Sequence, residues 1–224
     1  MSLKTLNKTQ KSAVEAIDGP VLIFAGAGSG KTRVLTHKIF YLVKKKLFKP
    51  EEILAVTFTN KAAKEMENRV KKLLKIDDLS LSIGTFHSIC AKILREDIKI
   101  LGFSRSFAIY DVKDQLDLIK VLFEQFDISK NIISPNQLRN QISLYKNKMI
   151  DCKTVKRKAR TKLEKTISDV YNQYQKSLKI NDALDFDDLL IFPLEIFREK
   201  PTVLKKYQKR WKYILVDEYQ DTNR

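Results

Sequence analysis

The sequence is poor in the residues that mark several protein classes. Its two cysteines, Cys90 and Cys152, lie far apart and outside any CxxC pattern. This argues against a disulfide framework and a zinc site, and favours a reducing, cytoplasmic setting. Six glycines and five prolines in 224 residues are too few for a largely disordered chain. The sequence has no long apolar run, and its first residues lack the apolar core of a secretory signal, so we expect no membrane span.

Acidic residues are also scarce relative to basic ones. The chain has 43 lysines and arginines against 27 acidic residues, a formal net charge of +16. An excess of this size predicts a polyanionic partner, although a solvated surface in a lysine-rich proteome is the alternative. The excess is greatest in residues 139–179, which contain twelve basic and three acidic residues, a net charge of +9.

The apolar residues follow an alternating strand and helix pattern. Short apolar runs at 20–26, 53–58 and 211–218 predict strands that are buried on both faces, and 81–86 and 106–111 predict weaker strands. Other stretches have apolar residues at helical spacing and predict helices. They are a stretch that Asn7 can cap and residues 32–46, 61–75 and 87–100. We therefore expect an α/β fold with a parallel sheet covered by helices on both faces.

Strand signals are missing from residues 112–181, where apolar residues recur at helical spacing. We interpret this region as a helical subdomain inserted into an α/β domain formed by residues 1–111 and 182–224. The strand that ends at Tyr110 or Asp111 is then expected in the same sheet as the strand at 213–217. Beyond the insertion, Asp185 and Asp188 are expected to cap and pack a helix, without a catalytic role.

The run "AGAGSGKT" (25–32) lies between a predicted strand and a predicted helix, the context of a phosphate-binding loop. Its backbone N–H groups can surround a phosphate, Lys31 supplies a positive charge, and Thr32 offers a hydroxyl to Mg²⁺. The strict pattern has glycine where this sequence has Ala25. A glycine-rich turn without a ligand is the alternative. The candidate ATP-binding residues are Ala25, Gly26, Ala27, Gly28, Ser29, Gly30, Lys31, Thr32 and the following Arg33.

The run "YILVDE" (213–218) supplies the acidic partner that such a loop needs. Asp217 follows an apolar strand at its carboxyl end, where ligands bind in open parallel sheets. It can hold Mg²⁺ through water, and Glu218 can polarise an attacking water. A helix-capping acidic pair is the alternative. The candidate metal residues are therefore Thr32 and Asp217.

Six short motifs occur in the order and spacing of one family. The runs "LNKTQ", "AGAGSGKT", "TFTNKAA", "GTFHS", "DFDDLL" and "VDEYQDTN" resemble those of superfamily 1 DNA helicases of the UvrD/Rep type, across residues 6–223. The resemblance implies a RecA-like P-loop NTPase domain with a helical insertion near the duplex. It implies that Gln10 reads adenine, with help from Arg33, and that Gln220 senses the γ-phosphate. It matches the phosphate, metal and general-base residues to Lys31, Thr32, Asp217 and Glu218.

Two further segments match the family's single-strand groove. They contain Thr57, Phe58, Thr59, Asn60 and Lys61 in the first, and Thr85, Phe86 and His87 in the second. The two phenylalanines can stack on bases, and the polar residues can contact phosphates. Core packing of both phenylalanines and a structural role for the histidine are the alternatives.

The resemblance implies the N-terminal motor part of an ATP-dependent helicase. Such enzymes use ATP and Mg²⁺ to move 3′→5′ on single-stranded DNA and at duplex junctions, in repair or replication. The family's later motifs lie in a second RecA-like domain, so we expect residues 1–224 alone to be inactive in hydrolysis and unwinding. The same half of a helicase–nuclease subunit is the runner-up. A non-catalytic nucleic-acid-binding protein does not need the phosphate and metal residues, and a small-molecule kinase does not explain the charge of +16.

Overall fold

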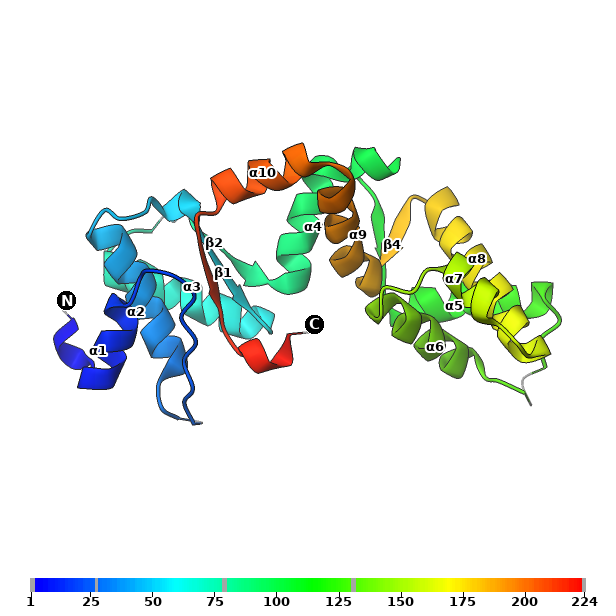
Figure 1. Cartoon of the computed structure of the whole chain (residues 1–224), viewed down its shortest axis with the longest axis horizontal. Coiled ribbons are helices and arrows are strands. Elements are labelled where there is room, and N and C mark those ends of the chain that lie inside the picture. Colours follow the sequence, from blue (N-terminus) through cyan, green and yellow to red (C-terminus); the bar gives the residue numbers. More distant parts are fainter. Residues whose placement is uncertain (1–2, 27, 78–79, 130–131, 223–224) are drawn as a thin grey trace. The chain divides into compact units, whose positions relative to one another are not determined.

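The computed structural model describes residues 3–26, 28–77, 80–129 and 132–222 (Figure 1). Its contacts divide the chain into two units, one formed by Met1–Ile89 with Leu204–Arg224 and the other by Cys90–Val203. Parallel strands alternate with helices, so the predicted α/β class with a parallel sheet is confirmed. None of the helices in the described ranges combines the length and the apolar character needed to span a membrane.

The first unit contains a three-stranded parallel sheet. Strand β1 (Ile53–Thr57) lies between β2 (Ser82–Thr85) and β5 (Tyr213–Val216). All five residues of β1 are buried, as expected for a central strand with both faces covered. Because the three strands are parallel, their carboxyl ends meet at one edge of the sheet, and this edge carries most of the predicted site residues.

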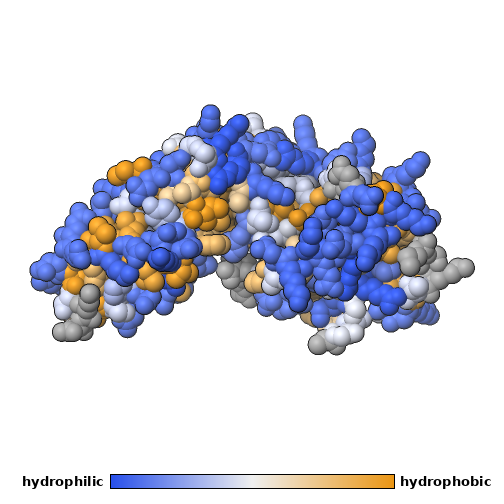
Figure 2. Space-filling view, turned by 180° about the vertical axis from the view of Figure 1, so that it is seen from behind, coloured by the Kyte–Doolittle hydropathy of each residue, from blue (hydrophilic) through white to orange (hydrophobic). Residues whose placement is uncertain are grey.

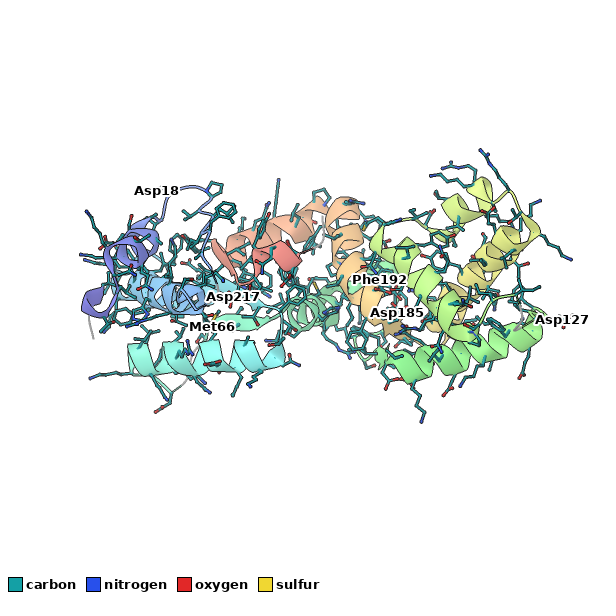
Figure 3. The ribbon with its side chains drawn as sticks, turned by 90° about the horizontal axis from the view of Figure 1, so that it is seen from below. Asp18, Met66, Asp127, Asp185, Phe192 and Asp217 are labelled. Atoms are coloured by element: carbon teal, nitrogen blue, oxygen red, sulfur yellow. The ribbon has the colours of Figure 1, made fainter. Side chains whose placement is uncertain are left out.

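Three helices of this unit matter for the site: α1 (Lys8–Glu15), α2 (Lys31–Lys44) and α3 (Asn60–Leu74). Helices α2 and α3 bury their apolar residues against the sheet, in a core that includes Ile39, Leu42, Met66 and Val70. Met66 is labelled in Figure 3. Short 3-10 turns occur at Leu3–Thr5, Pro50–Glu52 and Tyr219–Asp221. Two further helices, α4 (Phe86–Asp97) and α10 (Pro201–Arg210), begin in one unit and end in the other.

The strand predicted at 20–26 is wrong. Among the described residues, this run forms no strand and makes no ladder hydrogen bonds with β5. Leu22 is 58% exposed and Phe24 is 90% exposed. An apolar run forms a strand only when a neighbouring strand makes hydrogen bonds with its backbone N–H and C=O groups. The spacing of apolar residues in the sequence does not show whether such a neighbour exists. The segment that leads into the loop at 25–32 is therefore open to solvent.

The second unit has its own small sheet. Strands β3 (Ala108–Tyr110) and β4 (Ala183–Asp185) pair in parallel, with Ile109 opposite Leu184. The expectation that the strand ending at Tyr110 joins the sheet of residues 213–217 is therefore wrong. A strand's apolar pattern shows that the strand has a partner but not which one, and β4 is too short and too close to a helix cap to be recognised as that partner.

The elements between β3 and β4 are all helical in the described part of the chain. They are α5 (Val112–Gln125), α6 (Pro135–Asn147), α7 (Cys152–Lys158) and α8 (Lys162–Ile180). These helices contribute to one apolar core that includes Ile119, Leu138, Val155 and Tyr174. The α9 helix (Phe186–Glu199) and the 3-10 turn Ile98–Leu101 contribute to a second core in this unit. The predicted subdomain boundaries at residues 112 and 181 stay a prediction.

A buried ionic cluster joins α6 to the start of α9. The ammonium of Lys146 lies 2.6 Å from Asp185 Oδ2 and 2.7 Å from Asp188 Oδ1. Asp185 is labelled in Figure 3. The side chain of Asp185 accepts a hydrogen bond from the backbone N–H of Asp188, and the side chain of Asp188 accepts one from the N–H of Asp185. The prediction that these aspartates cap and pack a helix is confirmed. Sequence reasoning did not anticipate the lysine that they share.

Candidate functional site

The loop at 25–32 has the backbone conformation that its glycines allow. Gly28 and Gly30 have φ angles of +75° and +87°, in the left-handed region that other residues rarely adopt. Gly30 is the N-cap of α2, and the Ser29 hydroxyl donates to the Gly26 carbonyl at 2.7 Å. The free N–H groups of the first turn of α2 therefore follow a tight turn, which is the arrangement that binds phosphates. Ala27, also predicted here, lies outside the described residues.

The ammonium of Lys31 stays close to the loop. It donates to the carbonyls of Ala25 at 3.2 Å and of Gly26 at 3.4 Å. Both contacts are to neutral acceptors, and no acidic side chain pairs with Lys31 among the described residues. The positive charge is thus held at the loop without a competing carboxylate, where an anionic ligand can approach it.

The loop and the acidic end of the chain meet although they are distant in sequence. The Thr32 hydroxyl donates to Asp217 Oδ2 at 3.4 Å, across 185 positions of the chain. Asp217 follows β5 directly, and its N–H donates to the Val56 carbonyl of the neighbouring strand. The prediction that Asp217 stands at the carboxyl end of a strand is confirmed.

Asp217 is 6% exposed, and burial raises the pKa of its carboxyl group, with a further increase from the charge of Glu218. The only side-chain group that donates to it in the described part of the chain is the Thr32 hydroxyl. Lys31 opposes this increase in pKa through its charge, but no cation contacts the carboxylate among the described residues. Because burying a carboxylate without a contacting cation is costly, the Thr32 hydroxyl oxygen and the Asp217 carboxylate are suited to an added cation.

Glu218 and Gln220 form a short-range pair just beyond Asp217. Glu218 has φ +51° and ψ +50°, a left-handed conformation that is uncommon for a residue with a side chain. The Gln220 side-chain amide donates to Glu218 Oε2 at 2.6 Å. Unusual backbone angles of this kind often occur at functional sites, where the surrounding structure holds them.

The predicted adenine-reading residues also lie at the loop. Gln10 donates from Nε2 to the Ser29 carbonyl at 2.9 Å, and it forms a capping box with Asn7 at the start of α1. The Arg33 guanidinium donates to the Thr5 carbonyl at 2.9 Å. The structure therefore brings the N-terminal segment and the loop together, as the motif order indicated.

The residues of the predicted groove lie at the carboxyl ends of β1 and β2. The rings of Phe58 and Phe86 meet edge to face with centroids 6.4 Å apart, and Phe58 is 50% exposed. Thr59 caps α3 by accepting from the Ala62 N–H at 3.1 Å. Exposure of Phe58 disfavours the alternative that it is a core residue, and leaves its ring face available for stacking.

The remaining groove residues divide into exposed and buried ones. Asn60 and Lys61 are exposed in the first turn of α3, and His87 is half-buried in the first turn of α4. Thr57 and Thr85 are buried at the ends of their strands, where their hydroxyl groups bond to neighbouring backbone. Both threonines have a structural role in the free chain, so a ligand meets the exposed neighbours first.

One residue of this unit was missed by sequence reasoning. Lys38 is 3% exposed and donates from its ammonium to the Ala13 carbonyl at 3.0 Å and to the Ala16 carbonyl. Its signal was present in the sequence, because a lysine occupies the apolar stripe formed by Leu35, Ile39 and Leu42. A charged residue at a core position indicates a specific partner, although the pattern does not say which.

The chain matches the family model described as the UvrD/REP helicase N-terminal domain over residues 6–224. The chain belongs to this family. Its relatives include the ATP-dependent DNA helicases PcrA of Bacillus subtilis, with 46% identity over 99% of this chain, and of Staphylococcus epidermidis and Staphylococcus aureus, each with 43% identity over 99% of this chain. The chain spans about 30% of the length of these curated relatives. The family resemblance of the six motifs is thereby confirmed.

Proposed function

We propose that this chain is the ATP-binding part of an ATP-dependent helicase that moves 3′→5′ along single-stranded DNA, in cytoplasmic repair or replication. The observation that carries the proposal is the contact between Thr32 and Asp217 at 3.4 Å. This contact brings the candidate phosphate-binding loop next to the acidic residue at the carboxyl end of β5, and a nucleotide-hydrolysing site needs both parts. The names of the PcrA relatives support the same reading.

In this proposal the loop at 25–32 binds the β- and γ-phosphates of ATP. The N–H groups at the start of α2 and the Lys31 ammonium supply the donors, and Gln10 with Arg33 recognises the adenine. Lys31 exchanges two neutral carbonyls for phosphate oxygens, and charge-assisted hydrogen bonds are stronger than neutral ones.

The residues present also fit Mg²⁺. Thr32 and Asp217 offer oxygen atoms only, which this ion prefers, and the buried Asp217 carboxylate pairs with no lysine or arginine among the described residues. When bound, the ion would neutralise charge on the phosphates. Glu218 holds the attacking water as general base, and Gln220, which donates to Glu218 at 2.6 Å, connects that base to the γ-phosphate.

We place single-stranded DNA along the carboxyl edge of the sheet. Phe58 and Phe86 stack on bases, while Asn60, Lys61 and His87 contact the phosphates. Thr57 and Thr85 support this edge from beneath. Hydrophilic residues dominate the face of the molecule in Figure 2, and the net charge of +16 favours electrostatic binding with little sequence preference.

We further propose a RecA-like P-loop domain formed by residues 1–111 and 182–224, with residues 112–181 as a helical insertion that contacts duplex at a junction. Pairing of β3 with β4 supports the insertion, because it brings the two ends of the helical region to adjacent strands. The common core of α5, α6, α7 and α8 supports it too. In this scheme, a second RecA-like domain is the partner that completes the nucleotide site.

Calorimetric titration of the 224-residue chain with Mg-ATP tests the proposal. We expect affinity in the high-micromolar range, roughly −5 kcal/mol, and a loss of about tenfold or more in Lys31→Ala. The matched control is Lys44→Ala, which removes an exposed lysine from the other end of α2. Equal affinities of the wild type and Lys31→Ala would contradict an ATP site at this loop.

A further inference from the structure

Lys38 is a buried cation that has no acidic partner in the described structure. Its ammonium donates to two backbone carbonyls, Ala13 O and Ala16 O, at the carboxyl end of α1. These are acceptors that a helix leaves unsatisfied at its end, and a cation there also interacts favourably with the helix dipole. Lys38 therefore closes the end of α1 from a position on α2.

Three elements meet at this lysine, and each one carries a different part of the candidate site. Helix α1 carries Gln10, and α2 begins with Lys31 and Thr32. The Lys38 ammonium also lies 5.8 Å from the ring centroid of Tyr213, the first residue of β5, the strand that leads to Asp217. Lys38 does not contact Gln10, Lys31 or Asp217 itself. It contacts the three elements that position these residues.

The amino end of α1 is fastened to the loop by separate contacts. Gln10 donates to the Ser29 carbonyl at 2.9 Å, and Arg33 donates to the Thr5 carbonyl at 2.9 Å. A Cβ atom on Gly30 would lie 3.0 Å from Gln10 Nε2, which shows how closely the helix approaches the loop. Fixing both ends of α1 sets the position of the Gln10 amide relative to the loop at 25–32.

Energetics argue against a simple stabilising role. Burial lowers the pKa of Lys38, which means that the surroundings disfavour its charged form. Apolar residues at comparable buried positions are often as stabilising as charged ones or more so. A buried lysine without a carboxylate is better explained by the two carbonyls that it holds in place than by its contribution to folding.

We propose that Lys38 is a positioning residue that holds α1, and with it Gln10, in the place needed to read the adenine base. The inference rests on the proposed function, because it needs the adenine contact of Gln10. It adds a residue outside the six motifs to the parts of the chain that determine nucleotide selectivity.

The first test compares the affinities of the chain for ATP and ITP, which has an oxygen in place of the 6-amino group. We expect the wild type to prefer ATP by about tenfold, the value of one lost hydrogen bond. Lys38→Met should reduce that preference to about twofold, as should Gln10→Ala, while Lys38→Arg should keep most of it because a guanidinium can still donate to two carbonyls. Lys44→Met, on the same helix but exposed, should match the wild type.

A purely structural role would weaken both nucleotides equally and leave their ratio unchanged, and that result would overturn the inference. If Gln10→Ala also keeps the wild-type ratio, base reading by Gln10 fails, and with it both this inference and that part of the proposed function. Lys38→Gln replaces Lys38→Met if the latter does not fold.

A second test needs no nucleotide. Hydrogen exchange of backbone amides over α1 should be about tenfold faster in Lys38→Met than in the wild type, with no comparable change in α3. Unchanged exchange in α1 would refute the positioning role even if ATP does not bind. Faster exchange in α1 with an unchanged ratio of ATP to ITP affinity would show that loosening α1 has no effect on recognition of the base. That result would also refute the positioning role.

Discussion

Two pairs of acidic residues lie at the carboxyl ends of parallel strands in this molecule, one pair in each unit, and their surroundings differ. Asp217 and Glu218 follow β5, while Asp185 and Asp188 occupy the end of β4 and the first turn of α9. Asp217, Asp185 and Asp188 are all nearly inaccessible to solvent. The sequence patterns "LVDE" and "LDFDD" look alike, so the difference between the pairs lies in what the fold places against them.

The pair in the second unit has its own cation. Lys146 contacts both carboxylates, and the Tyr174 hydroxyl donates to Asp185 Oδ2 at 3.1 Å. Burial alone would lower the pKa of Lys146, but the two carboxylates outweigh it and raise the pKa above its ordinary value. The cluster is thus satisfied within the folded chain, and its charges are used for structure.

The pair in the first unit has no cation in direct contact with it among the described residues, and only the charge of the more distant Lys31 acts to lower the pKa of Asp217. Asp217 accepts side-chain hydrogen bonding only from the Thr32 hydroxyl there, and its pKa is raised by burial and by Glu218. The comparison teaches that an acidic pair at a strand end is structural when the fold supplies its counter-charge, and available for a ligand when it does not.

The largest effect is expected from removing the internal cation. Lys146→Met leaves Asp185 and Asp188 buried without a positive partner, and breaking a buried ion pair in this way costs about 3–5 kcal/mol of unfolding free energy. Urea denaturation of the chain measures it. Lys148→Met, an exposed lysine two residues later, is the control and should change stability by less than about 0.5 kcal/mol. A loss below about 1 kcal/mol in Lys146→Met would break the comparison.

The next effect concerns pH. Burial raises the pKa of Asp188 to about 7, with a further contribution from Asp185, against the ordinary 3.8. Between about pH 4 and 7 the folded cluster of Asp185, Asp188 and Lys146 therefore binds more protons than the same groups in the unfolded chain, so raising the pH through this window lowers stability.

Denaturation midpoints at several pH values between 4 and 8 test this prediction. Asp188→Asn should show a flatter profile over that window, whereas Asp187→Asn, which changes the neighbouring carboxylate, should keep the wild-type slope. An unchanged slope in Asp188→Asn would assign the titration to other groups.

A third effect sharpens the comparison at the other pair. Mg²⁺ should strengthen ATP binding to the wild type by about tenfold, or about 1.4 kcal/mol, because Thr32 and Asp217 can hold the ion. Asp217→Asn should lose most of this gain, while Asp185→Asn should retain it. Calorimetry with and without Mg²⁺ measures the difference, and an undiminished gain in Asp217→Asn would place the ion elsewhere.

The smallest effect is expected on stability at Asp217. Because this carboxylate is buried without a cation, Asp217→Asn should change the unfolding free energy by less than about 1 kcal/mol, and in the stabilising direction if any. Asp185→Asn should cost more, since Asp185 accepts from Lys146, from Tyr174 and from a backbone N–H. Equal losses in the two variants would mean that both pairs are structural.

Local features of the molecule followed from the sequence, and long-range ones did not. The loop glycines, the N-caps at Asn7 and Asp185, and the strand end before Asp217 depend on neighbouring residues, and the structure has them as predicted. The run at 20–26 and the partner of β3 were predicted wrongly, because strand pairing depends on segments far away in the chain. For the same reason, no pattern reveals that Lys146 meets Asp185 or that Lys38 meets Ala13.

The pairing of β3 with β4 has a consequence for how the chain folds. These strands are adjacent in space, but all of α5, α6, α7 and α8 lies between them in sequence. Closing such a long loop is entropically unfavourable until the helices between have compacted. We expect the amides of these helices to become protected from hydrogen exchange first. The amides of β3 should become protected only when β4 pairs with it, both in refolding and during synthesis on the ribosome. Pulse-labelled hydrogen exchange that finds β3 protected before α5 and α8 would reverse this order.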